Sequence, residues 1–161
     1  MKNAFWGMLL LLSMLCNSAT SCNRMDSFIQ PANIGENNSN ENMVSNRIII
    51  RIGAKSFAAT LLDNSAAKVF KQMLPLIINM KELNGNEKYG DLPKSLPANS
   101  SNPGTIHNGD LMLYGSNTLV VFYKTFSTSY NYTKLGVIDD AADLASALGG
   151  GNVSVTFELQ K

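Results

Sequence analysis

The sequence predicts a mainly β domain, a closed barrel of about eight strands with two short helices. From residue 47 onward, short apolar runs, some continuous and some alternating with polar residues, are separated by clusters of Gly, Pro, Asn and Ser. This pattern is typical of β-strands joined by tight turns. The first and the last runs are both predicted strands, and pairing them would close the sheet and remove its exposed edges.

Length and charge limit what the chain can be. It has 161 residues, enough for one domain and few for two, and a net charge of +1. Because there is no basic surplus to neutralise phosphates, nucleic-acid binding is not expected. Charged residues make up only 16% of the chain, against about 25% in typical proteins. Asn and Ser supply much of the polar surface instead, as is common in exported proteins.

Residues 1–22 have the three-part pattern of a secretory signal peptide. Lys2 supplies the positive charge, and residues 4–15 form an apolar run that is too short for a transmembrane helix. Both cysteines of the chain, Cys16 and Cys22, lie in this segment. The mature domain therefore has no disulfide, and its core alone must stabilise it.

The end of the signal resembles a bacterial lipobox, in which a cysteine is acylated and becomes the first mature residue. Small residues at Ala19 and Ser21 precede Cys22, although a Leu is more usual at the position of Ala19. We therefore predict lipidation of Cys22 and an exported, membrane-anchored lipoprotein of the bacterial cell envelope, on the periplasmic or surface side. The alternative is ordinary cleavage nearby, which would leave Cys22 as an unpaired thiol.

Residues 23–46 are dense in Asn and Ser and have little apolar periodicity. Such a composition cannot bury enough surface to offset chain entropy, so a flexible tether is predicted. It would hold the folded domain, residues 47–161, away from the lipid surface. A disordered terminus without this role is the alternative.

The domain is predicted to begin with a β-hairpin and a helix. Residues 47–52 are continuous and β-branched, and residues 56–61 alternate between apolar and smaller or polar side chains. A helix is predicted over residues 66–74, because residues 63–65 supply N-cap chemistry and Pro75 stops it.

The rest of the domain is predicted to be mostly strands. Residues 93–103 hold three prolines and are predicted to form a loop. The acidic group Asp139, Asp140 and Asp143 suits the N-terminus of a second helix over residues 139–148, and the glycines at 149–151 suit its C-terminus. Further strands are predicted over residues 76–80, 87–92, 110–114, 118–123, 134–138 and 152–159.

Several segments of this domain resemble the bacterial cyclophilin-like fold proteins. These are LNGNEKYGDLP at 83–93, GTIHNGDLMLYG at 104–115, FYKTFSTSYNYTKLGVID at 122–139 and ALGGGNVSVTFE at 147–158. The resemblance covers residues 47–158 and implies a closed β-barrel of the cyclophilin type, with the helices covering its ends. Many members of that family have no assigned function, so the resemblance is specific for a fold and not for an activity.

True cyclophilins are prolyl isomerases, and the resemblance therefore raises the question of their catalytic motif. Their site uses an Arg, within a Phe-His-Arg stretch, to hydrogen-bond the twisting amide, followed by a Met and Gln group. The comparable region here is Asn-Glu-Lys-Tyr at residues 86–89, without Arg, Phe or His. The arginines of the domain, Arg47 and Arg51, both lie on the first predicted strand. The family's catalytic residues therefore cannot be carried over, and isomerase activity stays an open question.

Other site types are not predicted. His107, the only histidine, lies in a Gly/Asn turn and is expected at the surface, since spacing supports no Ser-His-Asp arrangement. No metal is expected, because the acidic group at 139–143 is explained by a helix N-terminus. No cofactor is expected either, since the glycines at 149–151 follow a helix and lack the Lys-Ser of a phosphate loop.

The remaining candidate is a set of aromatic and polar residues suited to peptide or sugar recognition. Packing at the barrel rim is the alternative role for any one of them, but function concentrates on loops carried by rigid scaffolds. The predicted ligand-binding residues are Glu87, Lys88, Tyr89, Tyr123, Lys124, Phe126, Tyr130 and Tyr132.

The predicted function is a lipid-anchored, extracytoplasmic, cyclophilin-like binding module for an unknown peptide or small-molecule ligand. The alternative is a peptidyl-prolyl cis-trans isomerase with a non-standard site, in which Lys88 or Lys124 polarises the amide carbonyl. A third hypothesis, a small-molecule or glycan-binding accessory lipoprotein, differs from the first in ligand class only. The sequence predicts neither the ligand nor the oligomeric state.

Overall fold

The structure of the protein is a computed structural model that describes residues 45–161. The predicted signal peptide, the Cys22 lipidation site and nearly all of the predicted tether lie outside the described residues. Residues 45–161 contain ten strands and two helices. Neither of these helices has the length and apolar character needed to cross a membrane.

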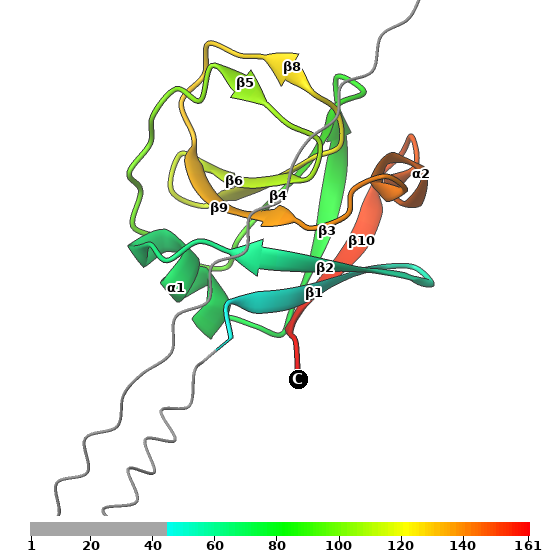
Figure 1. The fold of residues 1–161 in the computed structure, drawn as a ribbon, viewed down its shortest axis with the longest axis horizontal. Coiled ribbons are helices and arrows are strands. Elements are labelled where there is room, and N and C mark those ends of the chain that lie inside the picture. The colour runs from blue at the N-terminus through cyan, green and yellow to red at the C-terminus, as the bar shows by residue number, and fades with distance from the viewer. Residues whose placement is uncertain (1–44) are drawn as a thin grey trace, which may run out of the picture. The chain divides into compact units, whose positions relative to one another are not determined.

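Eight strands close into an antiparallel barrel, which confirms the predicted fold class (Figure 1). They are β1 (Arg47–Ile52), β2 (Lys55–Leu61), β3 (Leu76–Leu83), β4 (Glu87–Asp91), β6 (Asp110–Tyr114), β7 (Thr118–Phe122), β9 (Thr133–Ile138) and β10 (Val153–Leu159). Around the barrel their order is β1-β10-β3-β4-β7-β6-β9-β2.

The barrel closes through β1, the first strand of the domain. It pairs with β2 on one side and with the last strand, β10, on the other, so that Ile50 lies opposite both Phe57 and Phe157. The alternate isoleucines of β1 are buried, whereas the arginines at positions 47 and 51 are exposed. The pairing of the terminal strands predicted from the sequence is confirmed.

The first helix, α1 (Ser65–Gln72), packs its buried face on the barrel core. The side chain of Asn64 accepts a hydrogen bond of 2.8 Å from the Ala67 N–H, which is the N-cap interaction predicted from the sequence. The ring of Phe70 meets that of Phe157 edge to face at 5.8 Å between centroids. This contact ties the helix to the last barrel strand.

The second helix, α2 (Leu144–Leu148), is much shorter than predicted, because the aspartates before it form hydrogen bonds and ion pairs outside the helix. Asp139 accepts a hydrogen bond of 2.6 Å from Arg47, on β1. Asp143 occupies the N-cap position without a capping hydrogen bond and pairs with Lys55 at 3.1 Å. Asp139 and Asp143 therefore fasten this segment to the first hairpin. The helix begins at Leu144 and not at Asp139 as predicted, and of the acidic group only Asp143 lies at its N-terminus.

The domain has two apolar clusters, on opposite faces of β7. Leu119 and Val121 belong to the core inside the barrel, whereas Val120 and Phe122 belong to a smaller cluster outside it. The outer cluster also contains Ile106, and the half-buried Phe126 packs against it.

Both Ile106 and Phe126 belong to a pair of very short strands, β5 (Thr105–Ile106) and β8 (Phe126–Ser127). These strands pair with each other as a small separate sheet, outside the strand order of the barrel (Figure 1). The sequence did not predict them, because two residues carry no periodicity. They matter here because β8 begins the segment that borders the candidate site.

Candidate functional site

A cleft of about 570 Å³ lies beside the outer apolar cluster. This volume is within the range usual for small-ligand sites. Strands β4 and β7, the β3–β4 turn at residues 83–86 and the segment at residues 126–132 line it. Aromatic rings dominate the lining, namely Tyr89, Tyr114, Phe126, Tyr130 and Tyr132.

Strand alternation decides which residues of β4 reach the cleft. Successive side chains of a strand point to opposite faces. Lys88 pairs with Val121, which is in the barrel core, and is fully buried. Glu87 and Tyr89 therefore point outward, and both line the cleft.

The rings form a continuous series from the surface inward. Tyr130 meets Tyr114 edge to face at 6.3 Å, and Tyr114 meets Tyr132 at 5.7 Å. Tyr132 in turn meets Phe122 at 5.5 Å, and Phe122 meets Phe126 at 5.7 Å. Each such pair contributes roughly 0.5–1.5 kcal/mol beyond area burial, so the series holds the segment at 126–132 against the barrel.

Glu87 is a carboxylate without a partner beside these rings. Its side chain belongs to a residue only 9% exposed, and within residues 45–161 no hydrogen bond or ion pair reaches it. Burial, together with the nearby charge of Glu82, raises the pKa of Glu87 to about 6. The neighbouring Asn86 also lines the cleft, and its buried Oδ1 has no hydrogen-bond partner in the described residues.

Glu82, in contrast, is fully engaged and shapes one wall of the cleft. It accepts hydrogen bonds from Lys88, from the Tyr123 hydroxyl at 2.7 Å and from the Gly85 N–H at 2.8 Å. Burial favours protonation of Glu82, but these donors outweigh it and lower the pKa of the carboxyl below its usual value. The turn it holds contains Asn84 and Gly85 with positive φ angles of 55° and 67°.

Five of the eight predicted ligand-binding residues line this cleft: Glu87, Tyr89, Phe126, Tyr130 and Tyr132. The other three, Lys88, Tyr123 and Lys124, do not line it. Lys88 points into the barrel, where its ammonium also donates to the Gly149 carbonyl at 2.8 Å and the Gly151 carbonyl at 2.6 Å.

Tyr123 and Lys124 also lie outside the cleft lining. Tyr123 is 8% exposed, with its hydroxyl committed to Glu82 and its ring 5.8 Å from the Lys88 ammonium. Lys124 is exposed but does not line the cleft. Strand β7 ends at Phe122, so the strand pattern that places Val120 on the outer face no longer governs these two residues.

Sequence reasoning missed Tyr114, Asn86 and Thr118, which also line the cleft. Tyr114 had a usable signal. In β6 it lies two residues after Met112, which belongs to the outer cluster, and alternate strand residues share a face. The other two lack such a signal, because only the pairing of β4 with β7 and the form of the turn bring them to the cleft.

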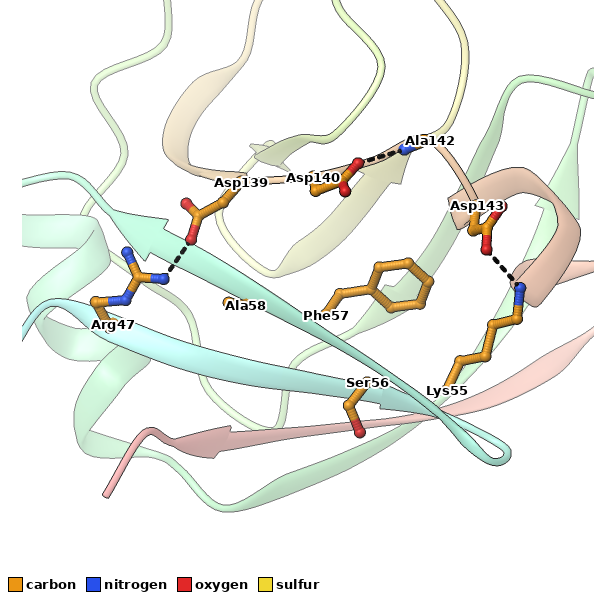
Figure 2. Close-up of a pocket in the computed structure, with 9 residues that line it drawn as sticks. All are labelled: Arg47, Lys55, Ser56, Phe57, Ala58, Asp139, Asp140, Ala142 and Asp143. Atoms are coloured by element: carbon orange, nitrogen blue, oxygen red, sulfur yellow. Dashed lines mark hydrogen bonds and ion pairs between the residues drawn. The ribbon is translucent and has the colours of Figure 1, made fainter.

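A second hollow, of about 670 Å³, lies between β2 and the segment that follows β9. Its charged side chains are already paired, as Figure 2 shows. Arg47 binds Asp139, Lys55 binds Asp143, and Asp140 accepts a hydrogen bond of 3.1 Å from the Ala142 N–H. These interactions satisfy the charges within the chain, so the hollow offers a ligand less than the aromatic cleft does.

Residues 50–158 match the sequence model of the cyclophilin-like family. The chain belongs to this family. A similar solved structure is the solution structure of the hypothetical protein AF2241 from Archaeoglobus fulgidus, with a TM-score of 0.52 and 16% identity. The match covers 75% of this chain and 99% of the other. At that identity the likeness shows the fold of the cyclophilin-like domain alone. No curated protein matches the chain.

The buried lysine of this cyclophilin-like domain should be essential for its stability. We expect Lys88→Ala to lower the free energy of unfolding by about 3 kcal/mol, because it leaves Glu82 and two glycine carbonyls without their shared donor. Urea unfolding followed by circular dichroism measures this. Lys124→Ala, which removes an exposed lysine nearby, serves as control and should change it by less than about 0.5 kcal/mol. Equal effects of the two substitutions on the free energy of unfolding would contradict this stabilising role of Lys88.

The unpaired carboxylate should instead reduce stability at neutral pH. The folded-state pKa of Glu87, about 6, lies above its ordinary value of 4.5, so the folded chain holds the proton more tightly than the unfolded chain does. The contribution of Glu87 to the free energy of unfolding therefore falls as the pH rises from 4.5 to 6. We therefore expect Glu87→Gln to raise the unfolding free energy at pH 7.5 by about 1 kcal/mol and to leave it little changed at pH 4.

Thermal and urea unfolding at both pH values test this, with Glu158→Gln as the matched control on a partly exposed glutamate that is paired with Arg51. A gain that is the same at pH 4 and pH 7.5, or a loss at pH 7.5, would show that Glu87 is not an unpaired buried charge.

Proposed function

We propose that this cyclophilin-like domain is a binding module whose ligand, a peptide or a small molecule, occupies the aromatic cleft. The observation that carries the proposal is a concave, ring-lined surface that also presents the Glu87 carboxylate, which no hydrogen bond or ion pair reaches within the described residues. Buried polar groups are usually paired, so unsatisfied ones in a cleft favour a ligand that supplies the missing donors.

The placement of the lysines supports binding over prolyl isomerisation. An isomerase of the kind considered above needs a cation in the cleft to hydrogen-bond the twisting amide. The ammonium of Lys88 donates its hydrogen bonds inside the barrel, and no Lys, Arg or His is among the described residues that line the cleft. The chemistry available there is aromatic stacking, hydrogen bonding by neutral hydroxyl and amide groups, and acceptance by the Glu87 carboxylate, which suits recognition.

We further propose that the module is exported and held at the bacterial envelope by a lipid on Cys22. The support comes from the sequence of residues 1–22, with its apolar run and lipobox-like end. The Asn/Ser-rich segment that follows would give the domain reach from the membrane surface to its ligand.

The binding proposal predicts that ligands perturb the cleft selectively. We expect compounds from a fragment and short-peptide library to shift the backbone amide NMR signals of residues 83–89 and 126–132 in the full-length chain. Tyr130→Ala should weaken such binding about tenfold, because it removes an exposed stacking surface worth roughly 1 kcal/mol or more. Ile77→Ala, which truncates a similarly exposed side chain on β3, should leave it unchanged.

The same samples serve in a prolyl-isomerisation assay, where we expect no acceleration. Acceleration that disappears in Tyr130→Ala or Lys124→Ala would replace the binding module with the isomerase. Ligand-induced shifts confined to residues outside the cleft would contradict the proposed site.

The anchor proposal predicts that radiolabelled palmitate is incorporated into the full-length chain and that Cys22→Ser abolishes the label, because acylation needs that thiol. Cys16→Ser, the matched control within the same segment, should retain it. Label that persists in Cys22→Ser, or that is lost only in Cys16→Ser, would refute the anchor.

A further inference from the structure

The described side chains that line the cleft can accept hydrogen bonds. The only formal charge among them is negative. Among the described residues that line it, Glu87 is the only one with a carboxyl group, and no basic side chain is present. The Asn86 Oδ1 adds an acceptor. The other polar lining groups are neutral: tyrosine hydroxyls, the hydroxyls of Thr118 and residues 127–129, and the side chain of Asn84. These neutral groups can both donate and accept, whereas the ionised Glu87 carboxylate only accepts, so a donor that carries a positive charge satisfies it best.

The aromatic lining has the same preference. The face of an aromatic ring carries negative electrostatic potential, so a cation above it is attracted, and rings grouped around a carboxylate attract it from several sides. Tyr89, Phe126 and Tyr132 line the cleft together with Glu87, and Tyr114 and Tyr130 line its more exposed part. An apolar cleft alone would not explain the carboxylate, because burying an unpaired charge is costly.

Other ligand classes fit less well. An anion would meet repulsion from Glu87 and from Glu82 behind it, whose proximity already disfavours ionisation of Glu87. A neutral apolar ligand would cover the carboxylate without providing a donor, which leaves the charge further desolvated. A guanidinium group both stacks on aromatic faces and donates to a carboxylate in a fork, and an alkylammonium does so as a point charge.

We propose that the cleft recognises an organic cation, a guanidinium or alkylammonium group, which seats over the rings of Tyr89, Phe126 and Tyr132 and donates to the Glu87 carboxylate. This inference rests on the proposed function, since it names the ligand class of the same cleft. A basic side chain of a peptide and a free amine carry the same chemistry, and the experiment below distinguishes them.

A proton and a cationic ligand compete for the Glu87 carboxylate, so the affinity for the cation should depend on pH. The groups whose charges act on Glu87 or feel it are Glu82 from β3, Tyr123 from the end of β7 and Tyr132 from the segment opposite. The tyrosines have raised pKa values and stay neutral at physiological pH, so Glu87 is the group that titrates near pH 6. Affinity for a cation should therefore be constant above pH 7 and fall about tenfold per pH unit well below 6.

The experiment uses isothermal titration calorimetry on the full-length chain at pH 7.5 and pH 5. The probes are acetyl-arginine amide, acetyl-lysine amide, free butylamine, and two matched controls, acetyl-citrulline amide, a neutral isostere of arginine, and acetyl-glutamate amide. We expect arginine or lysine amide to bind at least tenfold more tightly than citrulline, and this margin to shrink at pH 5. Tighter binding of the amino-acid amides than of butylamine indicates a peptide ligand, and the reverse order a free amine.

Two variants make the proposal falsifiable. Glu87→Gln should reduce cation binding at least tenfold and remove its pH dependence, while its melting temperature at pH 7.5 matches or exceeds that of the unaltered chain. Lys124→Ala should leave binding unchanged. Citrulline or glutamate amide binding as tightly as arginine amide, with sensitivity to Tyr130→Ala, would overturn the cation inference and leave the cleft as a binding site. Absence of binding by all five probes also overturns the cation inference, whereas the binding function itself fails only if the fragment library also leaves the cleft unperturbed.

Discussion

The barrel depends on one ion pair, between the fully buried Lys88 on β4 and the partly buried Glu82 on β3. A fully buried ammonium is tolerated only when its donors are satisfied, and here Glu82 and the carbonyls of Gly149 and Gly151 take them up. Glu82 also accepts from the Tyr123 hydroxyl, just beyond the end of β7. A single lysine thus joins adjacent strands to the glycine turn that follows α2. Removing it would leave an unbalanced charge and open carbonyls within this network.

The same pair explains why two glutamates five residues apart behave in opposite ways. Glu82 takes the lysine, a tyrosine hydroxyl and a backbone N–H, so its charge is stabilised and its pKa is lowered. Glu87, next to Lys88 in sequence, points to the other face of β4 and shares none of these donors. Strand alternation therefore produces one structural carboxylate and one that faces a cleft with its charge unmet. A protein usually avoids the second arrangement, and it persists most readily where a ligand is to be bound.

Much of the fold followed from the sequence, because strand periodicity and turn residues are local signals. The isoleucine run of β1, the alternating run of β10 and the N-cap at Asn64 each lie where their patterns predicted. The second helix does not begin where its pattern predicted. Tertiary ion pairs to the first hairpin, such as Arg47 with Asp139, outweighed the preference of aspartates for a helix N-terminus. Strands of two residues have no pattern to detect, so β5 and β8 could only be found in the structure.

The site could be predicted in composition but not in geometry. The sequence pointed to the correct aromatic segment, yet it treated Glu87, Lys88 and Tyr89 as neighbours in one surface. Their separation onto two faces follows from the pairing of β4 with β7, and the register that sets it is a long-range property. Tyr114 joins the cleft for the same reason, across a strand pair rather than along the chain.

Glu87 is a largely buried residue whose carboxylate has no partner of its own within the described residues. Direct titration by NMR, following the carboxyl carbon of Glu87 in the full-length protein as pH is varied, measures the pKa without relying on stability or on any ligand. We predict a midpoint near 6, with a lower value for Glu82 in the same spectra. A midpoint for Glu87 at or below its ordinary value of 4.5 would contradict the account, because it would mean that a donor already satisfies the charge.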